Sequence, residues 1–301
     1  MGRILSAKSD LIFKRVFGDV NNTDILASFL EATLRLEPEE YDRLELIDTH
    51  LNPKYEDDKL GILDVKVHTV TGRMIDIEIQ VLDVPKMRDR IVYYVSRMLS
   101  EQLKKGQSYD LNQVISIVIT DYVLISENDR YHNVYQLYDK QSDSTFTDLL
   151  EVNTLELPKL KNKAETDNHD LWNWMKFINA ESEEEFSMLD QGNENIRKAV
   201  GIVKQLSSDE QTRLEYDLRE KAKRDYYAGL YDSKELGRQE GIIEGRQEGL
   251  REGELKGKRE GLREGKIDMA RKALLKGFSV IDVSEISGLS VSEIERLTKN
   301  V

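Results

Sequence analysis

The sequence predicts an α/β protein in which helices flank a mixed sheet, followed by a helical tail. Residues 61–82 alternate apolar and polar side chains on both sides of a Thr-Gly dipeptide, which is the pattern of a β-hairpin. A helix at residues 85–105 and an apolar, β-branched strand at residues 114–120 come next, and this order favours a mixed sheet. Glycine then recurs at every fourth position of residues 237–265, which sets the tail apart from the sheet domain.

Composition limits the classes of function and location. The 301 residues can form one domain of about 150–200 residues with appendages. There is no cysteine, so disulfides and thiolate metal sites are excluded, and the composition is compatible with a reducing, cytoplasmic location. The four histidines do not have the spacing of zinc ligands. We expect no leader and no contact with a membrane, because neither the N-terminus nor any later run is apolar enough. The net charge of −13 argues against general coating of nucleic acid but allows a local basic groove.

The first predicted helix covers residues 8–18. Phe13 and Phe17 are four residues apart and share its apolar face, and Gly18 can end it. Asp10 and Lys14 are also four residues apart and share the opposite face. The spacing leaves two interpretations open, a capping acid with a surface cation or a pair that belongs to a site.

A helix at residues 21–36 and a strand at residues 44–51 lead into the hairpin. Residues 131–138 and 147–157 follow the central strand as two further strands, and the chain becomes helical from Asp170 onward. Together these elements complete a sheet with helices packed on it.

The register of the hairpin follows from its alternation. A connection at residues 70–72 puts a glycine where positive φ is needed and sets Val67 opposite Ile75 and Asp64 opposite Glu78. A two-residue turn would instead set polar residues of one strand opposite apolar residues of the other. The pattern therefore predicts the longer connection.

This register brings two carboxylates together. Directly opposed residues have Cβ atoms about 5 Å apart, and like charges there repel. Asp64 and Glu78 could share Mg²⁺, which takes oxygen ligands, and Gln80 lies on the same face. In the alternative interpretation this face is solvated and Lys66 and Asp76 form a surface ion pair. The alternation by itself favours this alternative.

The helix predicted at residues 85–105 is locally basic. Six cations and two carboxylates give it a net charge of +4. The residues are Lys86, Arg88, Arg90, Arg97, Lys104 and Lys105 against Asp89 and Glu101. Such a helix beside the carboxylates would attract a phosphate backbone, while its apolar residues pack on the sheet from another face.

In the repeat at residues 237–265, eight glycines are separated by seven Lys or Arg and seven Glu. Each glycine costs an isolated helix about 0.8–1 kcal/mol relative to alanine. A period of four would wind the glycines around the helix and favour a right-handed crossing with a partner. We expect a helix that forms on self-association; a flexible linker is the alternative.

Residues 267–301 predict a small all-helical unit. Ser290 and Glu293 have the spacing of a capping box, and Gly288 can form the turn before them. The sequence pattern is that of a helix-turn-helix, but the charge of the last helix favours packing or dimerisation over binding in the major groove of DNA.

Several of these segments resemble the restriction-endonuclease-like nucleases of the PD-(D/E)xK superfamily. Asp64 followed by Glu78-Ile79-Gln80 resembles their D…(D/E)xK signature, and most closely the branch of recombination-promoting, transposase-like nucleases, in which Gln commonly replaces the final Lys. Residues 8–18 contain every fixed letter of a KxDxxFKxxFG opening. Residues 90–109 resemble the R…YY…QL…G…Y pattern of the branch, whose members also carry such a glycine-rich tail.

The resemblance implies a restriction-endonuclease-like fold and a metal site. Asp64, Glu78 and the carbonyl oxygen of Ile79 would hold Mg²⁺ or another divalent cation. Asp10 and Lys14 would stand near this site.

Gln80 is the departure from the superfamily pattern. A lysine there could stabilise charge, whereas a glutamine can only orient groups by hydrogen bonds. Chemistry would then be slower, or Lys66 or Lys14 would supply the charge.

The chain is accordingly divided into a nuclease-like core at residues 1–165, a helical extension at 166–236, the repeat at 237–266 and a small helical tail at 267–301. We expect a divalent-metal-dependent DNA endonuclease that hydrolyses phosphodiester bonds in recombination or in mobile elements. The cations expected to contact DNA are Lys86, Arg88, Arg90 and Arg97. The alternative is a weak or inactive DNA-binding scaffold that forms homo-oligomers through the repeat. The intact carboxylate pair favours the enzyme.

Overall fold

The computed structural model describes most of the chain, namely residues 3–47, 50–51, 61–62, 64–103, 106, 108–162, 168–189 and 192–298. The chain forms two compact units, residues 1–220 and residues 221–301. Each unit is described by itself.

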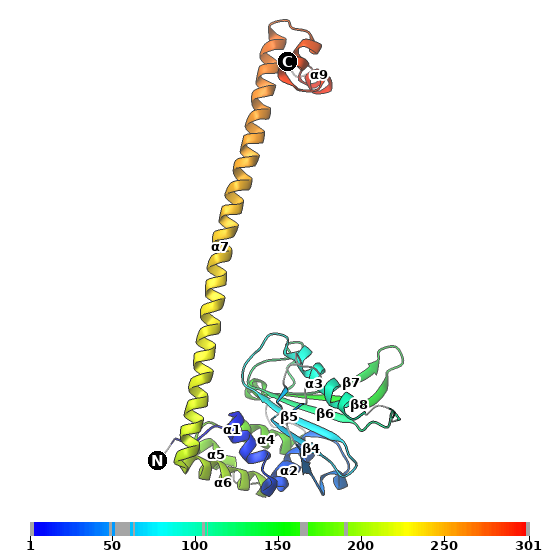
Figure 1. Cartoon of the computed structure of the whole chain (residues 1–301), viewed down its shortest axis with the longest axis vertical. Helices are drawn as coiled ribbons and strands as arrows, with labels where there is room; N and C mark the ends of the chain where they lie inside the picture. Colours follow the sequence, from blue (N-terminus) through cyan, green and yellow to red (C-terminus); the bar gives the residue numbers. More distant parts are fainter. Residues whose placement is uncertain are drawn as a thin grey trace. The chain divides into compact units, whose positions relative to one another are not determined.

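A six-stranded mixed sheet forms the centre of the first unit (Figure 1). The strand order is β1–β4–β5–β6–β8–β7, in which β5, β6 and β8 are parallel and the other neighbours antiparallel. The strands are β1 (Glu45–Leu46), β4 (Val65–His68), β5 (Met74–Gln80), β6 (Val114–Thr120), β7 (His132–Asp139) and β8 (Ser144–Glu156). Two short strands, β2 (His50–Leu51) and β3 (Gly61–Ile62), pair with each other separately. The predicted mixed sheet is thus confirmed.

The hairpin of β4 and β5 has the register that the alternation predicts. Val67 pairs with Ile75, and the amide of Thr69 donates a hydrogen bond to the carbonyl of Arg73 across the turn (3.0 Å). Gly72 has a φ of 87°, which an L side chain rarely adopts. The longer connection is therefore correct, although Leu63, which belongs to the predicted alternation, lies outside the described residues.

One face of the sheet is covered by helices that come before and after its strands in the sequence (Figure 1). They are α1 (Asp10–Phe17), α2 (Thr23–Thr33), α4 (His169–Asn179), α5 (Glu183–Met188) and α6 (Glu194–Ser208). A 3₁₀ turn at Val20–Asn22 joins α1 to α2, and two others, Pro38–Tyr41 and Leu157–Asn162, follow α2 and β8. Their core is aromatic: the rings of Phe13 and Phe17 lie 4.7 Å apart, and Trp174 packs on Phe17 at 5.6 Å. Gly18 ends α1 where a Cβ atom would meet the carbonyl oxygen of Lys14 at 2.8 Å.

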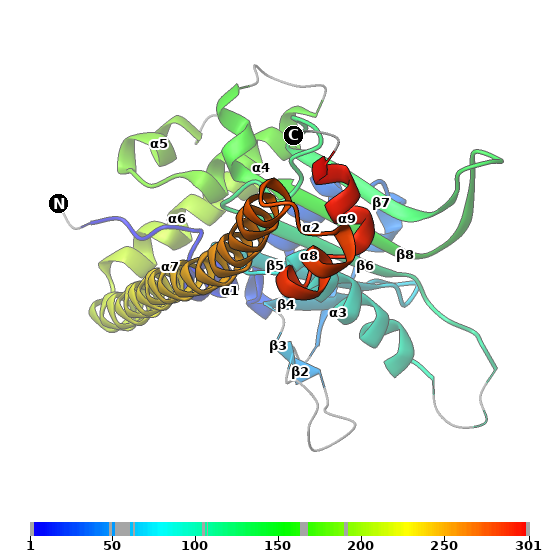
Figure 2. The ribbon, with the colours of Figure 1, turned by 90° about the horizontal axis from the view of Figure 1, so that it is seen from above.

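The other face is covered by α3 (Met87–Glu101), which lies across β5 and β6 from α4 and α6 (Figure 2). Its apolar residues bury a smaller core against Met74, Val114 and Val118. The helix begins two residues later than predicted because Lys86 adopts a left-handed conformation with a φ of 61°. Lys104 and Lys105, at the predicted end, lie outside the described residues.

The remaining boundaries differ from the predictions in detail. Strand β6 matches residues 114–120 and is buried on both faces, as predicted. The strand predicted at residues 44–51 is instead divided between β1 and β2, which pair in different sheets. Ser9, and not Asp10, is the N-cap residue of α1.

The second unit contains most of α7 (Glu210–Leu275), followed by α8 (Val280–Ser287) and α9 (Val291–Thr298). All eight glycines of residues 237–265 lie within α7. A small core joins its end to the last two helices through Ala270, Val283, Leu289 and Ile294. Within the described part of the chain, no helix is long and apolar enough to cross a membrane.

Candidate active site

Asp64 lies directly before β4 and is held by the neighbouring strand. Its Oδ2 accepts a hydrogen bond from the amide of Ile79 (2.9 Å), and its Oδ1 forms an ion pair with Nζ of Lys14 (3.1 Å). The hairpin register therefore fixes Asp64 against the backbone of β5, and α1 supplies a cation from outside the sheet.

Glu78 occupies the same part of β5. Its Oε1 accepts a hydrogen bond from the guanidinium of Arg90 on α3 (2.8 Å), and that guanidinium lies over the ring of Tyr94 at 5.2 Å. Each of the two carboxylates is thus paired with one cation, and the two cations come from helices on opposite faces of the sheet.

Burial shapes the electrostatics of the pair. Burial raises the pKa of Glu78 to about 7; the charge of Arg90 opposes this rise and that of Asp64 adds to it. Burial also raises the pKa of Asp64, against the lowering effects of the Ile79 amide and of Lys14. Both charges are costly in the folded protein, so a further cation at this position would stabilise them.

The polar face of the hairpin is buried, which overturns the interpretation as a solvated surface. Lys66, Asp76 and Glu78 are only 7%, 1% and 5% exposed. The physical reason is that α3 covers this face through tertiary contacts that the alternation does not contain.

Asp76 belongs to the candidate site, although the alternation suggested only a surface ion pair for it. Its Oδ2 accepts a weak hydrogen bond from Ser116 (3.4 Å), while its Oδ1 has no partner among the described residues. Burial raises its pKa well above the ordinary value, and the charges of Glu78 and Asp64 add to this rise. The signal was present in the sequence, since the alternation places Asp76, Glu78 and Gln80 on one face.

The other predicted site residues lie at different distances from the pair. Lys66 pairs with Asp76 in the strand register. Asp10 forms an ion pair with Arg219 of α7, and its charge still contributes to raising the pKa of Asp64. The side-chain amide of Gln80 donates to the carbonyl of Leu82 (3.1 Å).

A comparison with protein families matches residues 7–233 to the family described as PD-(D/E)XK nuclease family transposase. The chain belongs to this family. Comparisons with curated proteins and with solved structures gave no match. Membership indicates a nuclease-like function, and the mixed sheet flanked by helices is consistent with the restriction-endonuclease-like fold.

PD-(D/E)XK nucleases generally use divalent metal ions, and the donor set here fits such an ion. No three His, Cys, Asp or Glu side chains of the described residues are arranged to hold a metal. Mg²⁺, however, is usually bound through one or two carboxylates together with waters and substrate phosphates. Glu78 supplies a buried carboxylate and Asp64 one whose side chain is 12% exposed, and the unpartnered Oδ1 of Asp76 lies on the same sheet face as Glu78.

The cations expected to contact DNA differ in their surroundings. Lys86 is exposed at the start of α3, and Arg88 is half-exposed and paired with Glu127 (2.9 Å). Arg90 is engaged by Glu78. Arg97 is only 8% exposed and lies against Tyr93 and Glu101 of its own helix, an arrangement that does not favour a direct contact with DNA.

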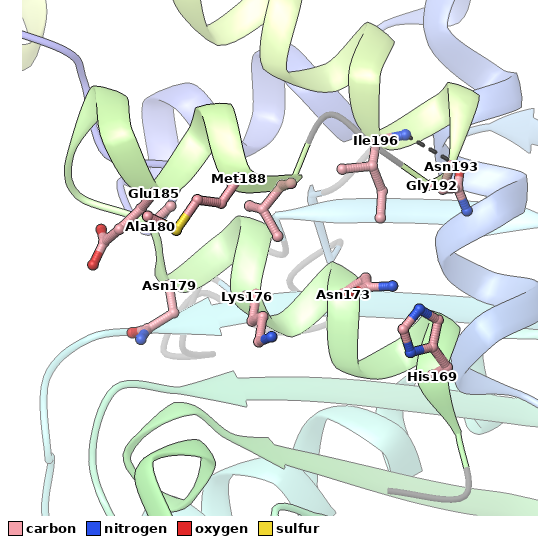
Figure 3. A pocket seen from close by; sticks show the side chains of 11 residues that line it. His169, Asn173, Lys176, Asn179, Ala180, Glu185, Met188, Gly192, Asn193 and Ile196 are labelled. Atoms are coloured by element: carbon pink, nitrogen blue, oxygen red, sulfur yellow. Dashed lines mark hydrogen bonds between the residues drawn. The ribbon is translucent and has the colours of Figure 1, made fainter. Parts of the chain in front are cut away.

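A cavity of about 550 Å³ lies among α4, α5 and α6, away from the carboxylates. Figure 3 shows His169, Asn173, Lys176 and Asn179 along one side of it, all from α4. None of the predicted site residues lines this cavity.

Proposed function

We propose that the protein is a divalent-metal-dependent DNA endonuclease that hydrolyses phosphodiester bonds, acting in recombination or in the movement of mobile elements. The observation that carries the proposal is the largely buried pair of Asp64 and Glu78, each held by one cation, on a hairpin inside the family match. We place this activity in the cytoplasm, with which the absence of cysteine is compatible.

The residues of the hairpin have separate roles in this proposal. Asp64, Glu78 and the carbonyl oxygen of Ile79 would hold the cation, which polarises the scissile phosphate and lowers the pKa of the attacking water. The amide of Ile79 orients Asp64, since it already donates to the Oδ2 atom of that carboxylate. Arg90 orients Glu78 in the same way.

Lys14 is the residue best placed to supply the charge that a lysine at position 80 would provide. Its side chain is about one-third exposed and its Nζ lies 3.1 Å from Asp64, so a phosphate at the carboxylates would meet it. Lys66, the other candidate, is buried on the hairpin.

A plasmid-nicking assay tests the proposal. We expect highly purified protein to cut with Mg²⁺ and not in excess EDTA, and Asp64→Ala and Glu78→Ala to abolish cutting. Asp225→Ala, which removes an exposed carboxylate on α7, is the matched control and should cut normally. Equal cutting in EDTA would reject the metal mechanism.

We also propose that the repeat at residues 237–265 drives formation of a homo-oligomer. The support is that a Cβ atom built on any of its eight glycines meets nothing within 4 Å, so the backbone along this part of α7 is open to close approach. In this proposal the repeat is a separate assembly element. It lies in the sequence between the core with its helical extension, residues 1–236, and the small helical tail, residues 267–301.

A further inference from the structure

A second cavity, of about 470 Å³, opens beside α3 on the sheet face that carries Glu78. Its walls come from α3, from the connection between β6 and β7, and from strands β7 and β8. Its lining residues include Arg88, Val92, Glu127, Arg130, Tyr135 and Thr154. Its volume falls in the range of about 300–1,000 Å³ that is usual for small-molecule sites.

The cavity lies in the same cross-strand row as the candidate catalytic carboxylate. Glu78 pairs with Val118 of β6, and Val118 pairs with Thr154 of β8, which lines the cavity. Adjacent strands are about 4.8 Å apart, so this row places Thr154 about 10 Å from Glu78. About three stacked nucleotides of a DNA strand span that distance, at about 3.4 Å each.

The walls combine the groups that bind a nucleobase. Apolar side chains of α3, of the connection and of β8 line the interior, and Tyr135 offers a partly exposed ring. Nucleobases stack on aromatic rings and on guanidinium planes. Arg88 and Arg130 also line the cavity and complement the phosphates of a strand.

Thr154 provides an independent sign of a ligand. The residue is 2% exposed, and its Oγ1 has no hydrogen-bond partner among the described residues. A buried hydroxyl without a partner costs free energy that a bound polar group would recover. A hydroxyl can donate or accept, so it suits the edge of any base.

We infer that this cavity binds an unstacked base of the DNA strand whose phosphate lies at Asp64 and Glu78. The choice of DNA as the occupant rests on the proposed function. Tyr135 stacks on the base, Thr154 contacts its edge, and Arg88 exchanges Glu127 for a phosphate of the strand. That exchange costs little, because the Arg88–Glu127 pair is exposed and such pairs contribute at most about 1 kcal/mol.

Photocrosslinking tests the inference without depending on cleavage. The full-length protein is mixed in EDTA with DNA in which 5-iododeoxyuridine replaces single thymidines, irradiated, and mapped by mass spectrometry. We expect a crosslink to Tyr135, and we expect Tyr135→Ala to weaken DNA binding roughly five- to a hundred-fold. Crosslinks confined to other tyrosines, such as Tyr93 or Tyr138, would overturn the inference.

An obstructed cavity gives the second arm of this experiment. Val92 is 61% exposed on α3 and lines the cavity, so Val92→Trp should place an indole ring in it without disturbing the core and should abolish the Tyr135 crosslink. The control Val134→Trp adds the same ring on the opposite face of β7, where it should leave the crosslink unchanged. An unchanged crosslink in Val92→Trp would contradict the inference.

Thr154→Val separates a binding role from a structural one. Because the hydroxyl has no partner among the described residues, the variant should keep or raise its melting temperature while DNA binding falls roughly two- to tenfold. In Thr120→Val, by contrast, a hydroxyl that donates to the carbonyl of Tyr122 (2.8 Å) is removed, and stability should fall. Normal DNA affinity in Thr154→Val would remove this residue from the site and overturn the inference.

The two proposals fail in different ways. A Tyr135 crosslink in a protein that never cuts DNA with Mg²⁺ would reject the endonuclease and support the base-binding cavity. Cutting with no crosslink at Tyr135 would support the endonuclease and overturn the cavity.

Discussion

The fold disfavours the charged form of the two carboxylates of the candidate site. Glu78 is buried and Asp64 is largely buried, and burial raises the pKa of each against the effect of one neighbouring cation. A residue in this position is expected to serve binding or catalysis, because stability alone would favour an apolar side chain there.

The first prediction at this scale concerns stability without metal. Asp64→Ala and Glu78→Ala should abolish cleavage, while the melting temperature in EDTA holds or rises slightly, because burial makes each of these charges costly in spite of its cation. Mg²⁺ should raise the melting temperature of the wild type and not of the variants. Thermal melts with and without Mg²⁺ beside the cleavage assay check this. An Asp64→Ala protein that melts several degrees lower in EDTA and still cuts would mean that the hairpin is only a scaffold.

Gln80 is the second test at the residue scale. Its amide donates to the carbonyl of Leu82. Because an amide is neutral, Gln80 brings no charge to the carboxylates. We expect Gln80→Lys to keep or raise the rate of DNA cleavage, because a cation there can stabilise the charge that develops at the phosphate. Gln136→Lys adds the same charge at an exposed position of β7 and should leave the rate unchanged. Loss of cleavage in a folded Gln80→Lys protein would show that the amide is needed.

At the scale of elements, the hairpin is fixed by its turn as well as by its strands. Glu40, which is buried in the turn before β1, accepts hydrogen bonds from the hydroxyl of Thr71 (2.7 and 2.8 Å) and forms an ion pair with Arg73. These contacts tie the connection of β4 and β5 to the neighbouring segment, so they help to hold the register that places Asp64 against Ile79.

The pH dependence of Glu40→Gln tests this role of the turn. Burial acts to raise the pKa of Glu40, but hydrogen bonds from Thr69 and Thr71 and the charge of Arg73 outweigh it and lower the pKa below 4.5. A lowered carboxyl pKa stabilises the fold above the ordinary pKa, and this contribution is lost as the pH falls through the folded value. Glu40→Gln should therefore cost about 1.5–3 kcal/mol in urea unfolding at pH 7, and the cost should shrink below about pH 4.5.

Glu39→Gln is the matched control for this measurement, since Glu39 is the exposed neighbour in the same 3₁₀ turn. It should change stability little at any pH. A cost for Glu40→Gln that stays constant down to low pH would exclude the charge of Glu40 as the cause.

At the scale of the whole molecule, the glycine repeat exposes helix backbone that another backbone could approach closely. All eight glycines lie on α7 with free space at the position of a Cβ atom. In an isolated helix each glycine costs stability, and in our proposal the close approach of a partner backbone compensates for this cost.

Substitution of three of these glycines by alanine tests self-association. Each of the changes Gly245→Ala, Gly249→Ala and Gly253→Ala should stabilise the helix by about 0.8–1 kcal/mol, so the helix content of the triple variant should rise. Its oligomeric mass in light scattering should nevertheless fall. The added methyl groups prevent the close approach that the glycines permit. Gln239→Ala with Gln247→Ala changes helix surface outside the stripe and should not lower the mass. A higher helix content with an unchanged mass would indicate a linker and not an interface.

The sequence by itself determined the local features of this protein. The period of two in β4 and β5, together with Gly72, predicts the hairpin register, because a shift by one residue would move every apolar side chain to the opposite face. Ser290 and Glu293 form the predicted capping box, since both partners lie within one turn. The motif residues likewise predicted the family that the comparison found.

Only the tertiary structure decided what surrounds these features. The burial of Lys66, Asp76 and Glu78 arises from α3, which covers their face from a later part of the chain. The pairing of Lys14 with Asp64 and of Arg90 with Glu78, and the burial of Arg97, also depend on contacts between distant segments or on the rotation of a helix. Alternation records which residues share a face, but not which element covers that face. For this reason the carboxylate pair could be predicted, whereas its burial, its cations and the cavity at Thr154 could not.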